Sequence, residues 1–348
     1  MRVILFCQNN YAFGILEPIR QILLQTERPF IWFITKKLEE GFPFKSDNYT
    51  TAIADLETFK SDAIFVPGNV VPYYLRGLKV QIFHGLAGEK KGHFRIRHYF
   101  DLYLTQGPYF TNRFKDLKTK FANFEVIETG WPKLDIYGKN KTIYDSEKDK
   151  LLNHYKANKI LLYAPTFSPK LTSAPFLIEP LKELAQNLDY LILIKFHPLM
   201  SIKWIEIYKE LAENNSNIRI QEEKNIVKFL LMADLLISDT SSVIYEFLLL
   251  DKPVITFKNI SKNILWEDSK DYTSLKRLVE SNLINDPYAK QRHIIYNEFH
   301  PYNDGKSALR MIEAVNNYIE ENGVPEKRKL SFFRRLKIHN IFGKQTVK

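Results

Sequence analysis

The chain has 348 residues, 45% of them hydrophobic, and a single cysteine. That length exceeds one compact core of the usual size and predicts two domains of roughly 150 residues each, and a single cysteine excludes an internal disulfide. The formal net charge is +10, and residues 326–348 carry eight basic residues against one acidic residue. The basicity is therefore concentrated at the C-terminal end, which argues against a chain that binds nucleic acid along its whole length.

Short apolar runs alternate with helix-like segments through the first half of the chain. Helices are expected at about residues 17–25 and 111–121, and strands at residues 3–7, 30–34, 63–66, 80–83, 102–104 and 125–128. Cys7 lies within the first apolar run, so we expect a buried structural thiol. Residues 138–158 are charged and polar, and we interpret them as a linker and the first helical stretch of a second domain.

The second half repeats the same alternation. Strands are expected at residues 160–164, 190–196, 218–221, 235–238 and 254–257, with helices at about residues 176–187, 203–214, 225–232 and 243–250. This order predicts an α/β protein with two Rossmann-like domains, at residues 1–150 and 151–322, followed by a basic tail at residues 323–348. In open parallel sheets, ligands bind beyond the carboxyl ends of the strands, so we expect a polar cleft between the two domains.

A histidine follows one expected strand of the first domain. His84 lies in IFHGLAGEKKG, directly after residues 80–83. An imidazole titrates near neutral pH and can take a proton from a hydroxyl, so His84 is a candidate general base. Gly85, Lys90 and Lys91 follow it and are candidate acceptor-side residues. The alternatives are a hydrogen-bonded structural histidine and a solvated pair of lysines.

Two strands of the second domain are also followed by polar side chains. Thr166 stands in YAPTF, and His197 stands in LIKFHPL, two positions after Lys195. His197 is a candidate for donating a proton or a hydrogen bond to a phosphate or leaving group, with Lys195 beside it. The Thr166 hydroxyl is suited either to binding a phosphate or to closing its turn.

Two further segments combine a turn with a helix start. The segment Asp239, Thr240, Ser241 and Ser242 precedes an expected helix, and hydroxyls with unpaired backbone N–H groups favour an anion such as phosphate. A capped helix that binds nothing is the competing interpretation. Asp304 and Gly305, in HPYNDGKSA, are a weaker candidate, because an ordinary helix start explains them as well.

Several motifs are absent from the sequence. It contains neither GxGxxG nor GxxxxGK[ST], which argues against a nicotinamide dehydrogenase and a P-loop kinase. It contains no D-x-D, and its histidines lack zinc-ligand spacing. We therefore expect a site without metal or cofactor, in which histidine, lysine and helix N-termini neutralise phosphate.

Taken in order, the segments IFHGLAGEKKG, ETGWPKLD, ILLYAPTF, LIKFHPL, DLLISDTSSVIYEFLLLDKPVITF and NDGKSA resemble the CDP-glycerol glycerophosphotransferase family of teichoic acid and capsule synthesis. The resemblance covers about residues 80–315. It implies the two-Rossmann arrangement called GT-B, with the acceptor at the N-terminal domain, the donor mainly at the C-terminal domain and no required metal. After His84-Gly85, many members have Thr-Pro where this chain has Leu86-Ala87. The resemblance therefore does not identify the acceptor.

The resemblance also implies roles for single residues. His84 corresponds to the base that activates the acceptor, and His197 to a histidine that contacts the donor phosphates. The residues implied to line or adjoin the donor site are Thr166, Asp239, Ser241, Ser242, Asp304 and Gly305.

The implied reaction is attack of an acceptor hydroxyl on the β-phosphorus of a CDP-alcohol, with CMP leaving. The implied partners are a CDP-alcohol or another nucleotide-activated donor and a lipid-linked or polymeric glycan acceptor. A nucleotide-sugar glycosyltransferase and a UDP-sugar 2-epimerase share the fold and stay open as alternatives, as does an inactive membrane-surface scaffold. Nucleic-acid binding is not favoured, because no binding motif accompanies the basic residues.

The C-terminal segment interleaves aromatic, aliphatic and basic residues that do not separate into two faces on a helical wheel. Such a segment fits an anionic membrane surface, and a disordered solubilising end is the alternative. No signal peptide and no run of about 18 apolar residues is visible. We therefore expect a cytoplasmic protein that is peripheral on the inner face of the cytoplasmic membrane.

Overall fold

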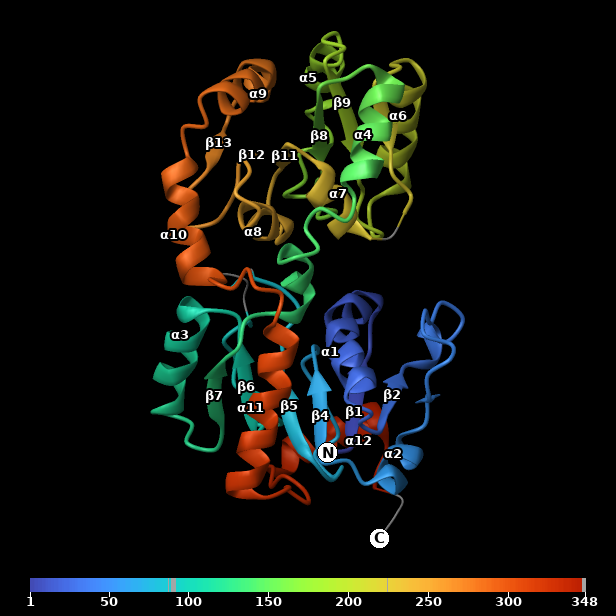
Figure 1. Ribbon diagram of the computed structural model, residues 1–348, viewed down its shortest axis with the longest axis vertical. Helices are drawn as coiled ribbons and strands as arrows, with labels where there is room; N and C mark the ends of the chain where they lie inside the picture. Colours follow the sequence, from blue (N-terminus) through green and yellow to red (C-terminus); the bar gives the residue numbers. More distant parts are fainter. Residues whose placement is uncertain (87, 89–91, 224, 346–348) are drawn as a thin grey trace. The chain divides into compact units, whose positions relative to one another are not determined.

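The computed structural model describes residues 1–348 apart from residues 87, 89–91, 224 and 346–348. The chain divides into two compact units, residues 1–139 with 298–348 and residues 140–297. Each unit is a parallel sheet flanked by helices (Figure 1). The predicted α/β class with two Rossmann-like domains is confirmed.

The sheet of the first unit has seven strands among the described residues, in the order β3-β2-β1-β4-β5-β6-β7, and every pairing is parallel. All residues of β1, β4, β5 and β6 are buried, as expected for parallel strands covered on both faces. The strands are β1 Val3–Cys7, β2 Phe30–Ile34, β3 Tyr49–Thr50, β4 Ala63–Val66, β5 Leu78–Gln81, β6 Leu102–Thr105 and β7 Glu125–Glu128.

Helices cover this sheet on both faces. The helices α1 and α11 pack against each other, and both also contact η3. On the other face, a hydrophobic core cluster joins Ile4 and Ile64 of the sheet to Phe114 of α3 and Ile338 of α12. The helical segments of this unit are η1 Asn10–Ala12, α1 Phe13–Gln25, η2 Lys36–Leu38, α2 Ile53–Phe59, α3 Pro108–Lys118, η3 Pro132–Tyr137, α11 Ser307–Asn322 and α12 Phe332–Phe342.

The sheet of the second unit has six strands among the described residues, in the order β10-β9-β8-β11-β12-β13, again all parallel. Its strands are β8 Lys159–Tyr163, β9 Tyr190–Ile194, β10 Ile218–Ile220, β11 Leu235–Ser238, β12 Val254–Phe257 and β13 Glu267–Ser269. Its helical segments are α4 Asp145–Tyr155, α5 Ile178–Leu184, α6 Ile202–Glu213, α7 Ile226–Met232, α8 Val243–Leu248, η4 Tyr272–Ser274, α9 Leu275–Ile284 and α10 Ala289–Phe299, whose last two residues belong to the first unit.

The division of the chain differs from the expected boundaries at both ends of the second domain. Residues 140–150 were expected in the first domain, but they belong to the second unit. Residues 298–322 were expected in the second domain, but they belong to the first unit. The cause is tertiary packing: α11 buries Met311, Ile312 and Val315 and lies beside α1. The amphipathic pattern of a helix shows that it has a buried face but does not name the sheet that it covers.

The C-terminal segment is ordered over part of its length. It contains the helix α12, whose Ile338 is fully buried in the first unit, while Phe333 of the same helix is 81% exposed. Phe342 packs against Phe6 and Phe33 of the sheet. Residues 332–342 therefore form an ordered helix, and the alternative of a disordered end does not hold for them. Apolar side chains lie on both the inward and the outward side of this helix, as the absence of two separate faces in the sequence indicates. No helix in the described ranges is long and apolar enough to cross a membrane.

Candidate functional site

The candidate base His84 stands on a turn that begins earlier than the sequence indicates. The strand β5 ends at Gln81 instead of residue 83, and Phe83 adopts a left-handed backbone conformation with φ of 60°. A bulky residue in this region costs about 1–3 kcal/mol and is tolerated only where its surroundings fix it. The Phe83 ring is buried and packs on His93 and Phe114. This packing turns the chain sharply and leaves His84 exposed at the carboxyl end of the sheet.

The hydrogen bond of His84 defines which ring nitrogen carries its proton. Nδ1 of His84 lies 3.0 Å from the carbonyl oxygen of Pro67, in the loop after β4. A carbonyl oxygen can only accept, so Nδ1 must be the N–H donor of the pair. In the neutral imidazole, Nε2 then carries the lone pair. His84 is therefore in the tautomer that can accept a proton at Nε2.

Other residues that the sequence analysis did not identify surround this turn. The Tyr11 ring lies 5.3 Å from the imidazole of His84, between ring centroids, and is half exposed. Nε2 of the fully buried Gln106, directly after β6, donates to the carbonyl oxygen of Gly85 at 3.1 Å. The strand-end position of Gln106 was a signal available in the sequence, whereas the contact of Tyr11 depends on the fold. Lys90 and Lys91 lie outside the described residues.

His197 of the second unit adopts the opposite arrangement. The backbone N–H of Leu199 donates to Nδ1 of His197 at 3.1 Å. A backbone N–H can only donate, so Nδ1 is the acceptor and the proton of the neutral ring resides on Nε2. Phe167 stacks on the ring with centroids 4.4 Å apart. His197 is therefore prepared to donate from Nε2.

Lys195 is half-buried, and its Nζ lies 3.4 Å from the carbonyl oxygen of Phe196. Burial lowers the pKa of the Lys195 ammonium, and Glu223 opposes that shift. The carboxyl ends of parallel β8 and β9 are neighbours, and they carry the loops of Thr166 and His197 respectively. The second unit thus brings Thr166 and His197 to one edge of its sheet.

Asp239 organises the loops at this edge. Its carboxylate is fully buried and accepts hydrogen bonds from the N–H groups of Thr166, Ser173 and Thr240 at 2.9, 2.8 and 2.6 Å, and from the Ser173 hydroxyl at 2.9 Å. Burial raises the pKa of the Asp239 carboxyl, and these bonds oppose the rise. A buried carboxylate would repel a phosphate. The arrangement supports a positioning role for Asp239, beside the hydroxyl-bearing residues that it orients.

The segment after Asp239 leads into a short helix. The helix α8 covers six residues, two fewer than expected, and Ser241 Oγ accepts from the backbone N–H of Val243 at 3.4 Å. Thr240, Ser241 and Ser242 are partly exposed. So short a helix has a weak dipole, because few peptide units add to it. Any phosphate binding here would therefore depend on hydroxyl and N–H groups more than on the helix.

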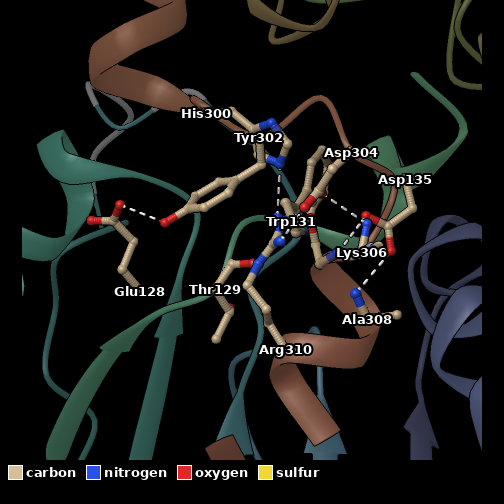
Figure 2. Close-up of polar contacts among 11 residues, drawn as sticks. Glu128, Thr129, Trp131, Asp135, His300, Tyr302, Asp304, Lys306, Ala308 and Arg310 are labelled. Atoms are coloured by element: carbon tan, nitrogen blue, oxygen red, sulfur yellow. Dashed lines mark hydrogen bonds and ion pairs between the residues drawn. The ribbon is translucent and has the colours of Figure 1, made fainter. Parts of the chain in front are cut away.

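The NDG loop belongs to the first unit and contacts the segment ETGWPKLD (Figure 2). The Asp135 carboxylate accepts from the N–H groups of Ser307 and Ala308, both at 2.8 Å, and so caps the start of α11. Asp304 accepts from Arg310 at 2.7 Å and from the N–H of Lys306. The Arg310 guanidinium lowers the pKa of the Asp304 carboxyl.

Two more contacts join the same segments (Figure 2). Nε2 of His300 accepts from the N–H of Trp131 at 2.9 Å, and the Tyr302 hydroxyl donates to Glu128 at 2.8 Å. These contacts give the segments ETGWPKLD and HPYNDGKSA a structural explanation, since they join the loop before α11 to the segment after β7. Asp304 and Gly305 thus lie in the first unit, and a donor-binding role for them stays a prediction.

A family model for CDP-Glycerol:Poly(glycerophosphate) glycerophosphotransferase matches residues 84–263. The teichoic acid glycerol-phosphate primase of Bacillus subtilis is 27% identical over 229 residues, which cover 56% of this chain and 52% of the relative. The teichoic acid glycerol-phosphate transferase of Staphylococcus aureus is 22% identical over 245 residues, which cover 62% of this chain and 60% of the relative. The teichoic acid glycerol-phosphate primase of Bacillus spizizenii is 40% identical over 101 residues, which cover 28% of this chain and 25% of the relative. The matches span from a quarter to about three fifths of the length of these relatives.

Solved structures extend the likeness to most of the chain. The wall teichoic acid polymerase TagF has a TM-score of 0.66 at 18% identity, with 92% of this chain and 89% of that chain covered. A UDP-GlcNAc 2-epimerase from Neisseria meningitidis, bound to UDP-GlcNAc, has a TM-score of 0.66 at 14% identity, with 91% and 100% covered. At these identities the likeness shows the shared GT-B-like fold alone.

Proposed function

The chain belongs to the CDP-glycerol:poly(glycerophosphate) glycerophosphotransferase family, and from this premise we propose that it transfers a glycerol-phosphate or related polyol-phosphate unit. The donor is a CDP-alcohol, and the acceptor is a hydroxyl of a lipid-linked or polymeric glycan in cell-surface polymer synthesis. The observation that carries the proposal is the pair of opposite histidine tautomers, one in each unit. One ring can accept a proton at Nε2 and the other can donate from Nε2.

In the proposed reaction, Nε2 of His84 takes the proton of the acceptor hydroxyl. The acceptor oxygen then forms a bond to the β-phosphorus of the donor. The phosphoanhydride bond to CMP breaks, and its electron pair leaves on the CMP phosphate. General-base assistance of this kind contributes about 10²- to 10⁴-fold to a rate.

The second unit binds the donor in this scheme. Nε2–H of His197 donates to a phosphate oxygen, and the Lys195 ammonium and the hydroxyls of Thr166 and Ser242 add further stabilisation. Such groups are effective because they are oriented before the reaction begins. The buried carboxylate of Asp239 accepts hydrogen bonds from the N–H groups of Thr166 and Thr240, and this supports the preorganisation. The scheme uses no metal ion, so chelators should leave turnover unchanged.

The membrane contact is proposed for the outer side of α12, and with it a location at the inner face of the cytoplasmic membrane. Phe332 and Phe333 are 60% and 81% exposed on a helix that is anchored through Ile338. Arg335 and Lys337 are exposed beside them. Exposed aromatic rings flanked by cations fit an interface with anionic lipid headgroups. A lipid-linked acceptor at that surface would make the contact useful.

The function is tested by titrating the purified chain with CDP-glycerol, CDP-ribitol, CMP, UDP and UDP-N-acetylglucosamine, without metal and again with EDTA. A ligand that binds only the folded state at 100 times its Kd stabilises it by about 2.7 kcal/mol. We expect a thermal shift with the cytidine nucleotides and CMP release when acceptor is added. A shift with uridine nucleotides alone would overturn the proposal and favour a nucleotide-sugar glycosyltransferase with this fold.

A further inference from the structure

The carbonyl oxygen of Pro67 accepts two side-chain hydrogen bonds. One comes from Nδ1 of His84 at 3.0 Å, and the other comes from Nε2 of Gln81 at 3.3 Å. Gln81 Nε2 also donates to the carbonyl oxygen of Val66 at 3.2 Å. A carbonyl oxygen has two lone pairs, so it can accept both donors at once. Gln81 and His84 are thus linked through one backbone oxygen.

Gln81 occupies an unusual place for a polar side chain. It is the last residue of β5, 2% exposed, and its Cα pairs with that of Val66 on β4. Buried amides need hydrogen-bond partners, and this one finds them on the end of the neighbouring strand. Because Pro67 has no N–H, it cannot extend the sheet by donating. The Gln81 amide therefore fixes the backbone at the point where the strand pairing ends.

We propose that Gln81 is a positioning residue that selects the tautomer of His84. By holding the Pro67 carbonyl in place, Gln81 keeps the proton of His84 on Nδ1 and leaves the Nε2 lone pair for the acceptor hydroxyl. Residues behind a functional histidine commonly define its tautomer and orientation in this way. The inference rests on the proposed function for its catalytic consequence, but the tautomer itself is independent of any substrate.

The chain offers a matched comparison on the same turn. Gln106 is another buried glutamine, and its Nε2 donates to the carbonyl oxygen of Gly85 instead of Pro67. Methionine is close to glutamine in length and shape and lacks the donor. Gln81→Met and Gln106→Met therefore both remove a buried amide beside His84, but only Gln81→Met removes support from the oxygen that accepts from Nδ1.

The experiment is nitrogen NMR of the full chain with ¹⁵N-histidine, with the His84 signal assigned by its loss in His84→Gln. We expect a protonated Nδ1 and an unprotonated Nε2 in the parent and in Gln106→Met, and a mixture of tautomers in Gln81→Met. If His84 of the parent chain carries its proton on Nε2, the proposal is overturned before any variant is measured. An unchanged His84 signal in Gln81→Met would overturn it as well.

Kinetics separate a positioning role from a merely structural one. We expect kcat of Gln81→Met to fall about tenfold or more, with KM for CDP-glycerol within about twofold. Asn282→Leu, which removes a buried amide from α9 of the second unit, is the control for stability loss. Equal kcat in Gln81→Met and Asn282→Leu would contradict the catalytic consequence. If the parent transfers nothing from any CDP-alcohol, the proposed function fails, and the tautomer result still decides the inference.

Discussion

Gly130 lies so close to Ser307 that a Cβ atom added to the glycine would be 2.4 Å from the serine Oγ. Gly130 also has a φ of 84°, which side chains rarely adopt. The contact joins the segment after β7 to the first residue of α11 and explains why a glycine follows Thr129. The contact lies beside the hydrogen bonds that the backbone N–H groups of Ser307 and Ala308 donate to Asp135.

The substitution Gly130→Ala should therefore destabilise the first unit. Left-handed backbone and crowding together predict a loss of about 2–4 kcal/mol. Gly14→Ala is the control, because Gly14 lies in α1 with no atom within 4 Å of its added Cβ. The Gly14→Ala variant should be as stable as the parent or up to about 1 kcal/mol more stable. Urea unfolding of both variants checks this, and equal midpoints would contradict the tight approach to Ser307.

The two histidines should separate catalysis from donor binding. His84→Ala should lower the transfer rate by about 10²- to 10⁴-fold and leave the Kd for CDP-glycerol nearly unchanged. His197→Ala and Ser242→Ala should weaken donor binding, His197→Ala by about tenfold or more, because a hydrogen bond to a charged group is lost. Calorimetry with a slow donor analogue measures the affinities. The same donor affinity in all three variants would refute this division of roles.

Stability should depend on pH through His300. Burial and the Arg310 guanidinium lower the pKa of His300 to about 4 in the folded protein. The unfolded chain binds a proton at this ring below about pH 6.5, where the folded protein does not. The stabilising contribution is complete above pH 6.5 and is lost as the pH falls from 6.5 to 4, by at most about 1.4 kcal/mol per pH unit.

The variant His300→Gln isolates this effect. An amide oxygen can accept the same N–H of Trp131, and it does not titrate. Thermal unfolding at pH 7.5, 6.0 and 5.0 should therefore show a smaller loss of stability in the variant than in the parent. A parent and a variant with parallel pH profiles would show that His300 is not excluded from protonation by folding.

The outer side of α12 should carry the binding to anionic vesicles. The double substitution Phe332→Ser with Phe333→Ser should weaken binding by at least about tenfold, because each buried phenyl contributes about 1.5–3 kcal/mol. Removing residues 327–348 is not a clean test, since it also removes the buried Ile338. Ile284→Ser, at a 79% exposed position of the second unit, is the control.

Sedimentation with vesicles of mixed anionic and neutral lipid measures this binding, and salt should weaken it. Equal binding by the parent and the double variant, or equal binding to purely neutral vesicles, would refute the proposed surface. The transfer rate to a soluble acceptor analogue should stay at the parent level in the double variant.

Most strands could be predicted from the sequence because parallel strands buried on both faces appear as short apolar runs. The fully buried strands at residues 3–7, 63–66, 235–238 and 254–257 have the expected bounds. The less buried strands at residues 30–34 and 125–128 have the expected bounds as well. The two-residue β3 and the polar β13, Glu267–Ser269, were missed because neither forms an apolar run. The strand β5 was placed two residues late, because Ile82 and Phe83 are buried without belonging to it.

The sequence by itself determined the α/β class, the two parallel sheets and the positions of His84, Thr166 and His197 after strands, because hydrophobic periodicity and strand ends are local properties of a chain. Only the tertiary structure decided that α11 and α12 belong to the first unit. It also decided that His84 meets the carbonyl of Pro67, 17 residues earlier, and thereby its tautomer. Such contacts depend on the order of strands in a sheet, which brings together loops that are distant in the sequence and leaves no mark in either loop alone.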